Sequence, residues 1–198
     1  MSISSKRSIT LRKLIIFIII AVVLIVGSVL GFAFADFLHE QMDLQRYPIK
    51  YSEIVENCAR EYGVPREMIY AVIHTESDFK EDAVSHVGAK GLMQIIDETN
   101  EWIAFRTGED VMAERIFEPT VNIRRGTWLL SYLYSEFGAW EEALAAYNAG
   151  IGRVRGWLDD PAVSSDGKKL DTIPIAETSA YVERVMKAAE KYRALYFE

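Results

Sequence analysis

The stretch from Pro65 to Gln94 holds the residues best suited to acid–base chemistry. In PREMIYAVIHTES, Glu76 falls on the same stripe as Ile69 and Ile73, one face of an α-helix, where the pattern asks for an apolar side chain. An ionised carboxylate there is costly, so it finds hydrogen-bond partners or its pKa rises. A half-buried acid of this kind suits general acid–base catalysis. The alternative is a Glu that only caps the backbone at the end of its helix.

The segment that follows this helix can bring neutral donors to Glu76. It reads SDFKEDAVSHVGAKGLMQ, and its glycines allow the chain to fold back over the helix end. Ser85, Gly88, Gly91 and Gln94 would then offer hydroxyl, backbone and amide donors to the carboxylate. We also expect a short extended piece within residues 88–96.

Other chemistries find little support in the sequence. Asp78, Glu81 and Asp82 are candidates for the second carboxylate of a glycosidase pair, or else are solvated loop charges. The three histidines and Cys58 lack metal-ligand spacing, so we expect no metal site. Cys58 falls on an apolar helical stripe, which favours a buried structural thiol over a nucleophile. The absence of a Walker loop or a dinucleotide fingerprint implies no cofactor.

The N-terminal part predicts attachment to a membrane. Residues 14–35 carry no charge, and these 22 residues can cross a hydrocarbon core of ~30 Å. Four basic residues precede them, so residues 1–13 are predicted to be cytoplasmic and the rest extracytoplasmic. The alternative is secretion after cleavage of a signal peptide near Ala35, at Ala33-Phe34-Ala35. The length of the apolar run favours a retained single-pass anchor in the cell membrane.

After the apolar run we predict a polar tether at residues 36–50 and one globular domain at residues 51–198. Residues 1–35 hold four of the 22 Lys and Arg residues and none of the 29 Asp and Glu residues, so the remainder carries a net charge of −11. Such a surface repels nucleic acid and anionic lipid, which makes both unsuitable ligands.

Helical periodicity and capping residues predict an all-α domain. Alternating β patterns are nearly absent. The irregular stretch 159–174 is expected to be the one long loop and the natural place for mobility. The predicted helices span residues 52–62, 65–76, 97–105, 119–138, 141–147, 151–157 and 178–196.

Aromatic residues cluster in the second half of the domain. At helical spacing most of them suit a core, although a few could line a sugar cleft, because aromatic rings match the C–H faces of sugars. The candidates are Trp128, Tyr132, Tyr134 and Trp140.

Three separated blocks give the sequence a resemblance to a known family. They are ES-x-F-x-x-x-A-x-S-x-x-GA-x-GLMQ from Glu76 to Gln94, AYNAG from Ala146 to Gly150, and IP-x-x-ET-x-x-YV from Ile173 to Val182. Together, over about residues 51–195, they resemble the soluble-lytic-transglycosylase domain of bacterial murein-degrading enzymes, a relative of goose-type lysozyme in fold.

The resemblance implies cleavage of the β-1,4 bond between N-acetylmuramic acid and N-acetylglucosamine without water, leaving a 1,6-anhydro end. It makes Glu76 the sole catalytic carboxylate, acting first as an acid and then as a base. Its substrate-binding residues carry over to Ser85, Gly91, Met93, Gln94, Tyr147, Asn148, Glu177 and Tyr181.

The family pattern is not matched everywhere. Ile96 and Asp97 stand where Met and Pro are usual, and Ser179 stands where Arg is common, which points to altered substrate contacts. The implied ligand is a peptidoglycan glycan strand, near a wall-building or secretion machine that the sequence does not identify. Two alternatives remain: a lysozyme-like hydrolase with a second carboxylate, and an inactive domain that binds glycan or recruits wall machinery.

Overall fold

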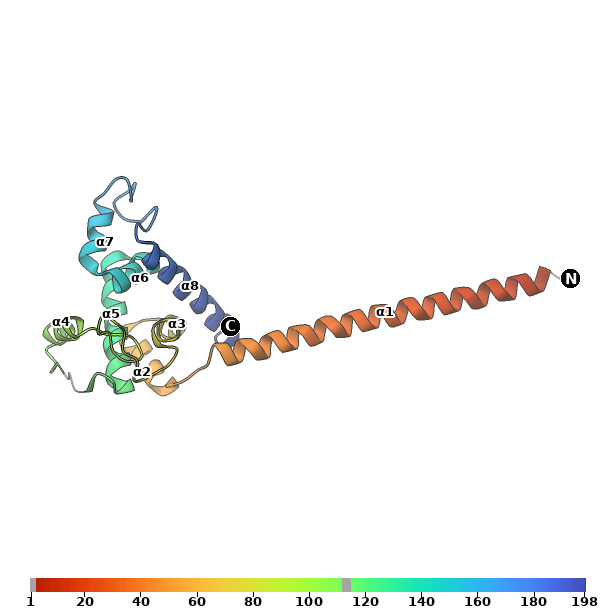
Figure 1. Ribbon diagram of the computed structural model, residues 1–198, viewed down its shortest axis with the longest axis horizontal. Helices are drawn as coiled ribbons and strands as arrows, with labels where there is room; N and C mark the ends of the chain where they lie inside the picture. The colour runs from red at the N-terminus through yellow and green to blue at the C-terminus, as the bar shows by residue number, and fades with distance from the viewer. Residues whose placement is uncertain (1–2, 112–114) are drawn as a thin grey trace. The chain divides into compact units, whose positions relative to one another are not determined.

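The computed structural model describes residues 3–111 and 115–198 and divides the chain into two units at Pro48. The first unit is formed by one long apolar helix, α1 (Ile3–Arg46) (Figure 1). Within the described residues, the stretch Ile16–Arg46 is the one helix long and apolar enough to cross a membrane. Because α1 continues to Arg46, most of the predicted tether is helical.

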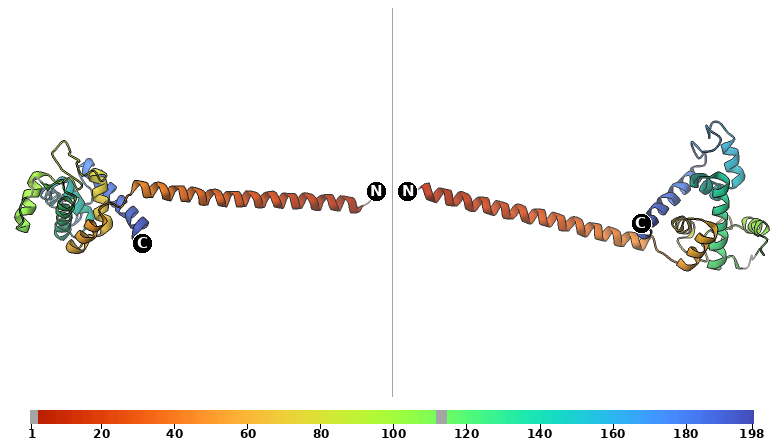
Figure 2. Two further views of the ribbon diagram at one scale, coloured as in Figure 1. Left: turned by 90° about the horizontal axis from the view of Figure 1, so that it is seen from below. Right: turned by 180° about the vertical axis from the view of Figure 1, so that it is seen from behind.

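The second unit, residues 49–198, is all-α in its described part, which confirms the predicted fold class. Figures 1 and 2 show α6 and α7 near the first turns of α8. The helices are α2 (Ser52–Tyr62), α3 (Arg66–Ser77), α4 (Asp97–Thr107), α5 (Pro119–Phe137), α6 (Trp140–Ala149), α7 (Ile151–Leu158) and α8 (Ala176–Tyr196).

The helix ends follow the expected local chemistry. Pro119 occupies the first turn of α5, where its missing N–H is no loss. Gly63 and Gly138 end α2 and α5 in the left-handed conformation that glycine adopts without strain. Asp97 lies in the first turn of α4, after Ile96 at the cap position.

The core of the second unit forms where α3 packs on α8 and where α5 packs on α2 and α6. The apolar stripe of α3 lies inside it, with Ile69, Val72 and Ile73 fully buried. Cys58 is buried as expected, and burial raises the pKa of its thiol to about 11. A thiol with such a pKa is not a nucleophile near neutral pH.

Hydrogen bonds hold two irregular segments of the second unit. Residues 78–96 contain two isolated β-bridges, Val84 with Lys90 and Lys90 with Ile95, which provide the short extended piece expected there. The long loop at residues 159–174 is tied to α6, because the N–H of Leu170 donates to the buried carboxylate of Glu142 at 2.9 Å.

Candidate active site

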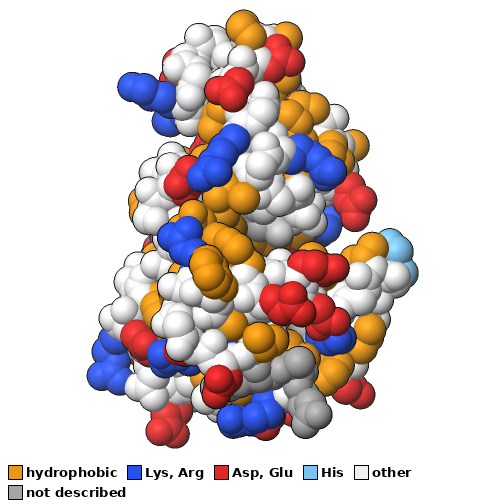
Figure 3. Space-filling model, turned by 90° about the vertical axis from the view of Figure 1, so that its left-hand side faces the viewer, with side chains coloured by type: hydrophobic (Ala, Val, Ile, Leu, Met, Phe, Trp, Pro, Cys, Tyr) orange, Lys and Arg blue, Asp and Glu red, His pale blue; other side chains and the backbone are white. Residues whose placement is uncertain are grey.

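A cleft of about 600 Å³ runs along the second unit between the segment 85–102 and the helices α5 to α8. Figure 3 shows hydrophobic side chains in the hollow between the upper and lower parts of this unit, with acidic side chains gathered beside it. Three carboxylate side chains line the cleft: Glu76, Glu98 and Glu177. Within the described residues, no Lys or Arg side chain lines it.

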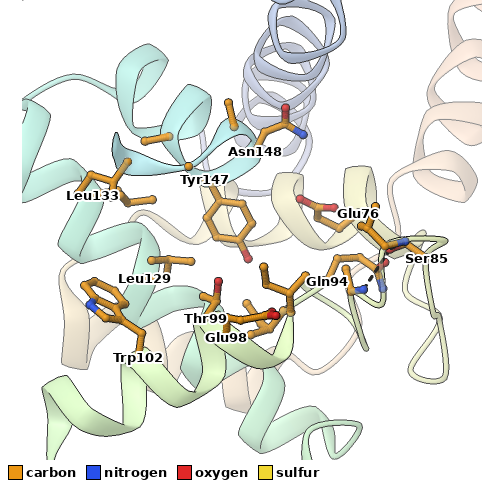
Figure 4. A pocket seen from close by; sticks show the side chains of 18 of the residues that line it. Glu76, Ser85, Gln94, Glu98, Thr99, Trp102, Leu129, Leu133, Tyr147 and Asn148 are labelled. Atoms are coloured by element: carbon orange, nitrogen blue, oxygen red, sulfur yellow. Dashed lines mark hydrogen bonds between the residues drawn. The ribbon is translucent and has the colours of Figure 1, made fainter. Parts of the chain in front are cut away.

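Glu76 reaches the cleft from the last turn of α3 (Figure 4). The hydroxyl of Tyr181 on α8 donates to its Oε1 atom at 2.7 Å. Burial raises the pKa of Glu76 to about 7, while the hydrogen bond from Tyr181 and the charge of Arg184 act in the opposite direction. A carboxyl group with this pKa can give and take a proton near neutral pH.

The chain turns sharply after Glu76. Asp78 and Phe79 both have positive φ angles, of 51° and 60°, which are uncommon for residues with a side chain. Ser77 fastens the turn, because its buried hydroxyl donates to the carbonyl of Leu92 at 2.8 Å. Glu76 is therefore held at the point where α3 meets the segment carrying GLMQ.

Asn122 on α5 anchors this GLMQ segment from behind, and the sequence reasoning missed it. Its side chain is fully buried and accepts a hydrogen bond from the N–H of Met93 at 2.7 Å. Its amide group donates to the carbonyls of Lys90 at 3.0 Å and Ile116 at 2.8 Å. A buried amide whose donors and acceptor are all used fixes the backbone around it.

Gly91 and Met93 lie behind the surface of the cleft. Gly91 has φ +75°, and a Cβ atom there would lie 2.4 Å from the side-chain nitrogen of Asn122. The side chain of Met93 packs on Gly126, where an added Cβ would lie 2.4 Å from the Met93 sulfur. Neither residue lines the cleft.

Ser85 and Gln94 both line the cleft, at the end that holds Glu76 (Figure 4). The Ser85 hydroxyl oxygen accepts bonds from the N–H groups of Val87 and Ala89, which hold its side chain in place. The amide nitrogen of Gln94 donates to the carbonyls of Ala83 and Gly91, at 3.1 and 2.8 Å. Gln94 therefore offers a ligand its carbonyl oxygen rather than its amide N–H.

The AYNAG block ends α6 and contributes Tyr147 and Asn148 to the cleft. The Tyr147 hydroxyl donates to the carbonyl of Met93 at 2.7 Å, and burial together with the charge of Glu76 raises its pKa well above the usual range. The side-chain oxygen of Asn148 accepts a bond from Thr178 on α8 at 2.8 Å. These two bonds join the second block to the first and third blocks.

The third block supplies two residues with different positions. Tyr181 is buried, does not line the cleft and contacts Glu76 directly. Glu177 is exposed at the start of α8 and lines the cleft. Thr178, between them, is buried and was not singled out from the sequence.

The aromatic residue at the far end of the cleft is Trp102, which the sequence analysis did not single out (Figure 4). The four aromatic candidates, Trp128, Tyr132, Tyr134 and Trp140, do not line the cleft. We call Glu76, Ser85, Tyr147 and Asn148 the acid end, and Trp102, Leu129 and Leu133 the aromatic end (Figure 4).

The other acidic candidates near Glu76 lie outside the cleft. Asp78 ends α3 and lies 3.3 Å from the Nδ1 atom of His74, and Glu81 accepts a hydrogen bond from Tyr51 at 2.5 Å. Asp82 is exposed. Of the departures from the family pattern, Ile96 lines the cleft, Asp97 pairs with Lys90 at 2.7 Å, and Ser179 is exposed on α8.

A carboxyl group with a raised pKa in an open cleft is a candidate catalytic acid and base. The family comparison is specific: the Transglycosylase SLT domain family matches residues 53–169, so the chain belongs to this family. The soluble lytic murein transglycosylase of Salmonella typhimurium is 35% identical over 153 residues, covering 75% of this chain and 24% of that protein.

A second relative and a solved structure extend the comparison. The membrane-bound lytic murein transglycosylase C of Klebsiella pneumoniae is 32% identical over 167 residues, covering 73% of this chain and 46% of that protein. The X-ray structure of an inactive mutant of lytic transglycosylase Slt from Pseudomonas aeruginosa is 34% identical with a TM-score of 0.65, covering 75% of this chain and 25% of that one. The chain thus spans less than half the length of these relatives.

Proposed function

We propose that this protein is a lytic murein transglycosylase that cuts the bond between N-acetylmuramic acid and N-acetylglucosamine in peptidoglycan. The observation that carries the proposal is the state of Glu76. Glu76 lies in the cleft, and its pKa is about 7. It also begins the first of the three sequence blocks, and the relatives in this family are named for the proposed activity. The inactive form of the Pseudomonas relative carries a single Glu-to-Gln substitution, in keeping with an essential Glu.

In the proposed reaction Glu76 acts twice. It first donates its proton to the glycosidic oxygen as the bond to C1 of the muramyl sugar breaks. The N-acetyl group of that sugar stabilises the cationic C1 atom. Glu76, now ionised, takes the proton of the 6-hydroxyl, whose oxygen bonds to C1 and closes the 1,6-anhydro ring. Glu76 regains its proton, and no water is consumed.

The surroundings of Glu76 suit both steps. Burial favours the neutral carboxylic acid that the first step needs, and the hydrogen bond from Tyr181 favours the ionised form that the second step needs. The two effects together place the pKa near neutrality, where a group can act as acid and base in one cycle. A 6-hydroxyl held by the substrate itself reacts as an intramolecular nucleophile, which favours ring closure over attack by water.

A hydrolase is the second candidate, because two further carboxylates line the cleft. Glu98 and Glu177 could hold a water for attack on C1, a role for which Asp78 and Asp82 are poorly placed outside the cleft. The products distinguish the two reactions. A transglycosylase leaves 1,6-anhydro-muramyl ends, and a hydrolase leaves reducing ends.

The deciding experiment is mass spectrometry of fragments released from purified peptidoglycan by the full-length protein in detergent. We expect anhydro-muramyl ends from the wild type and none from Glu76→Gln. Reducing ends would favour the hydrolase, and intact wall with both proteins would favour a domain that only binds glycan.

We also propose that α1 is a retained anchor that keeps residues 49–198 on the extracytoplasmic side. The length and apolarity of the stretch Ile16–Arg46 support this, as does the existence of a membrane-bound relative. Membrane fractionation followed by intact-mass measurement tests it. A soluble product that begins just after Ala35 would instead identify a cleaved signal peptide.

A further inference from the structure

The aromatic end of the cleft has a built surface that the proposed reaction does not use. Trp102 projects from α4 and lines the cleft together with Leu129 and Leu133 from α5. In Figure 4, Tyr147 lies between Trp102 and the end that holds Glu76 and Ser85. A ligand that contacts both Glu76 and Trp102 must therefore extend past Tyr147.

Three neighbours hold the indole ring of Trp102 in place. It meets the ring of Trp128 at 5.6 Å and that of Tyr132 at 5.0 Å, both edge to face, and these two rings stack on each other at 5.5 Å. The guanidinium carbon of Arg106 lies 5.5 Å from the Trp102 ring centre and 4.8 Å from that of Tyr132. Such contacts fix the ring without covering it completely.

Helix packing alone does not account for this arrangement. Trp128 and Tyr132 join α4 to α5 but do not line the cleft, whereas Trp102 is half-buried and does. Leu129 and Leu133 give this end of the cleft an apolar side, and Glu98 and Thr99, one turn before Trp102 on α4, add polar groups that also line the cleft. A rigid, partly exposed indole with apolar side chains and a few polar groups around it suits the C–H face and the hydroxyl groups of a pyranose ring.

We propose that Trp102 is a sugar-binding platform that extends the glycan site past Tyr147 and makes cleavage depend on strand length. The proposal rests on the proposed function, because it assigns the same cleft a longer substrate. Strands long enough to reach Trp102 gain a stacking contact, and shorter strands that fill only the acid end do not. Trp102 therefore sets how long a strand must be for efficient binding.

The test uses the full-length protein in detergent and linear glycans of alternating N-acetylglucosamine and N-acetylmuramic acid, of four and of eight sugars. The variants are Trp102→Ala and Trp102→Leu, of which the second keeps an apolar side chain against Trp128 and Tyr132. The matched control is Phe105→Ala, which removes an aromatic ring that lies on the same helix, is 83% exposed and does not line the cleft. Circular dichroism checks the fold of each protein.

Two quantities are measured for each glycan: kcat/KM for release of anhydro ends, and the dissociation constant by calorimetry in the Glu76→Gln background. For the eight-sugar glycan we expect both Trp102 variants to weaken binding and to lower kcat/KM by about tenfold, the size of one aromatic contact. For the four-sugar glycan we expect less than about a twofold change by the same reasoning. Phe105→Ala should match the parent protein with both glycans.

Equal losses with both glycans, or no loss with either, would overturn the platform. So would loss of the fold in both variants, since Trp102 would then serve packing alone. The calorimetry separates failure of the platform proposal from failure of the proposed function. If the wild type releases no anhydro ends but Glu76→Gln binds the longer glycan more tightly through Trp102, the reaction is wrong and the platform stands.

Discussion

The two ends of the cleft are built by different interactions. At the acid end, directed hydrogen bonds hold the polar groups, among them those from Tyr181 to Glu76, from Tyr147 to the Met93 carbonyl and from Thr178 to Asn148. At the aromatic end, rings packed on one another hold Trp102. A hydrogen bond fixes the direction of one atom, which proton transfer requires, whereas ring packing fixes a surface, which recognition of a sugar face requires. Substitutions at the acid end should therefore change the reaction rate and its pH profile, and substitutions at the aromatic end should change the dependence on glycan length.

The largest effect is expected at the acid end from Glu76→Gln. The substitution keeps the shape of the side chain but removes the group that exchanges a proton, so the rate of anhydro-end release should fall by about 10²- to 10⁴-fold. Thermal unfolding should show an intact fold. A variant that retains more than about a tenth of the wild-type rate would remove Glu76 from the mechanism.

Asn122→Ala should loosen the backbone of the GLMQ segment next to the acid end, although Asn122 itself does not line the cleft. Three buried hydrogen bonds to the backbone of Lys90, Met93 and Ile116 are lost, so the free energy of unfolding should fall by about 3 kcal/mol. Chemical denaturation measures this. The matched control is Asn57→Ala on the exposed face of α2, and an equal loss in both would deny Asn122 its anchoring role.

The raised pKa of Glu76 predicts how stability depends on pH. In the folded protein the pKa is about 7, against 4.5 for the ordinary group, so the folded state holds this proton more tightly than the unfolded state. Below about pH 4.5 the carboxyl group is protonated in both states and does not lower the free energy of unfolding. As the pH rises from about 4.5 to about 7, the group lowers the free energy of unfolding progressively. Relative to the wild type, Glu76→Gln should gain up to about 3 kcal/mol of stability across this range. Denaturation curves for both proteins at several pH values measure this difference in stability. A difference that stays constant with pH would contradict the prediction.

Tyr181→Phe is expected to have the smallest effect, because it removes one hydrogen bond and leaves the ring in place. That bond lowers the pKa of Glu76, so its loss should move the alkaline limb of the pH–rate profile to higher pH. We expect kcat to fall about tenfold because Glu76 is less well oriented. Tyr134→Phe, which alters an exposed tyrosine, serves as the control. An unshifted profile would mean that Tyr181 only fills space.

Much of the fold could be predicted because it depends on local patterns. The stripe containing Ile69 and Ile73 and the stops at Gly63 and Gly138 fix helices whose ends differ from expectation by only a residue or two. Glu76 stood out because a carboxylate interrupted such a stripe. Local pattern did not reveal that α1 continues past the apolar run to Arg46, because a polar stretch is compatible with both helix and coil.

The parts of the site that escaped prediction depend on contacts between distant residues. Asn122 carries no local signal, since its importance comes from a backbone segment about thirty residues earlier in the chain. Trp102 was overlooked in favour of Trp128, because both fit a helical stripe and only the tertiary arrangement decides which of them meets the cleft. Gly91 and Met93, which the resemblance predicts to bind substrate, pack against Asn122 and Gly126, contacts that only the tertiary structure reveals.

The close approaches at Gly91 and Gly126 limit how this sequence can evolve. Each glycine faces a side chain that would lie within 2.4 Å of a first added carbon, Asn122 in one case and Met93 in the other. A mutation at Gly126 is therefore tolerated only alongside a change at Met93, whereas one at Gly91 is strained in any case by its φ of +75°. Homologues should consequently keep glycine at position 91 and vary at positions 93 and 126 together, and single-site libraries should find almost no permitted replacement at either glycine.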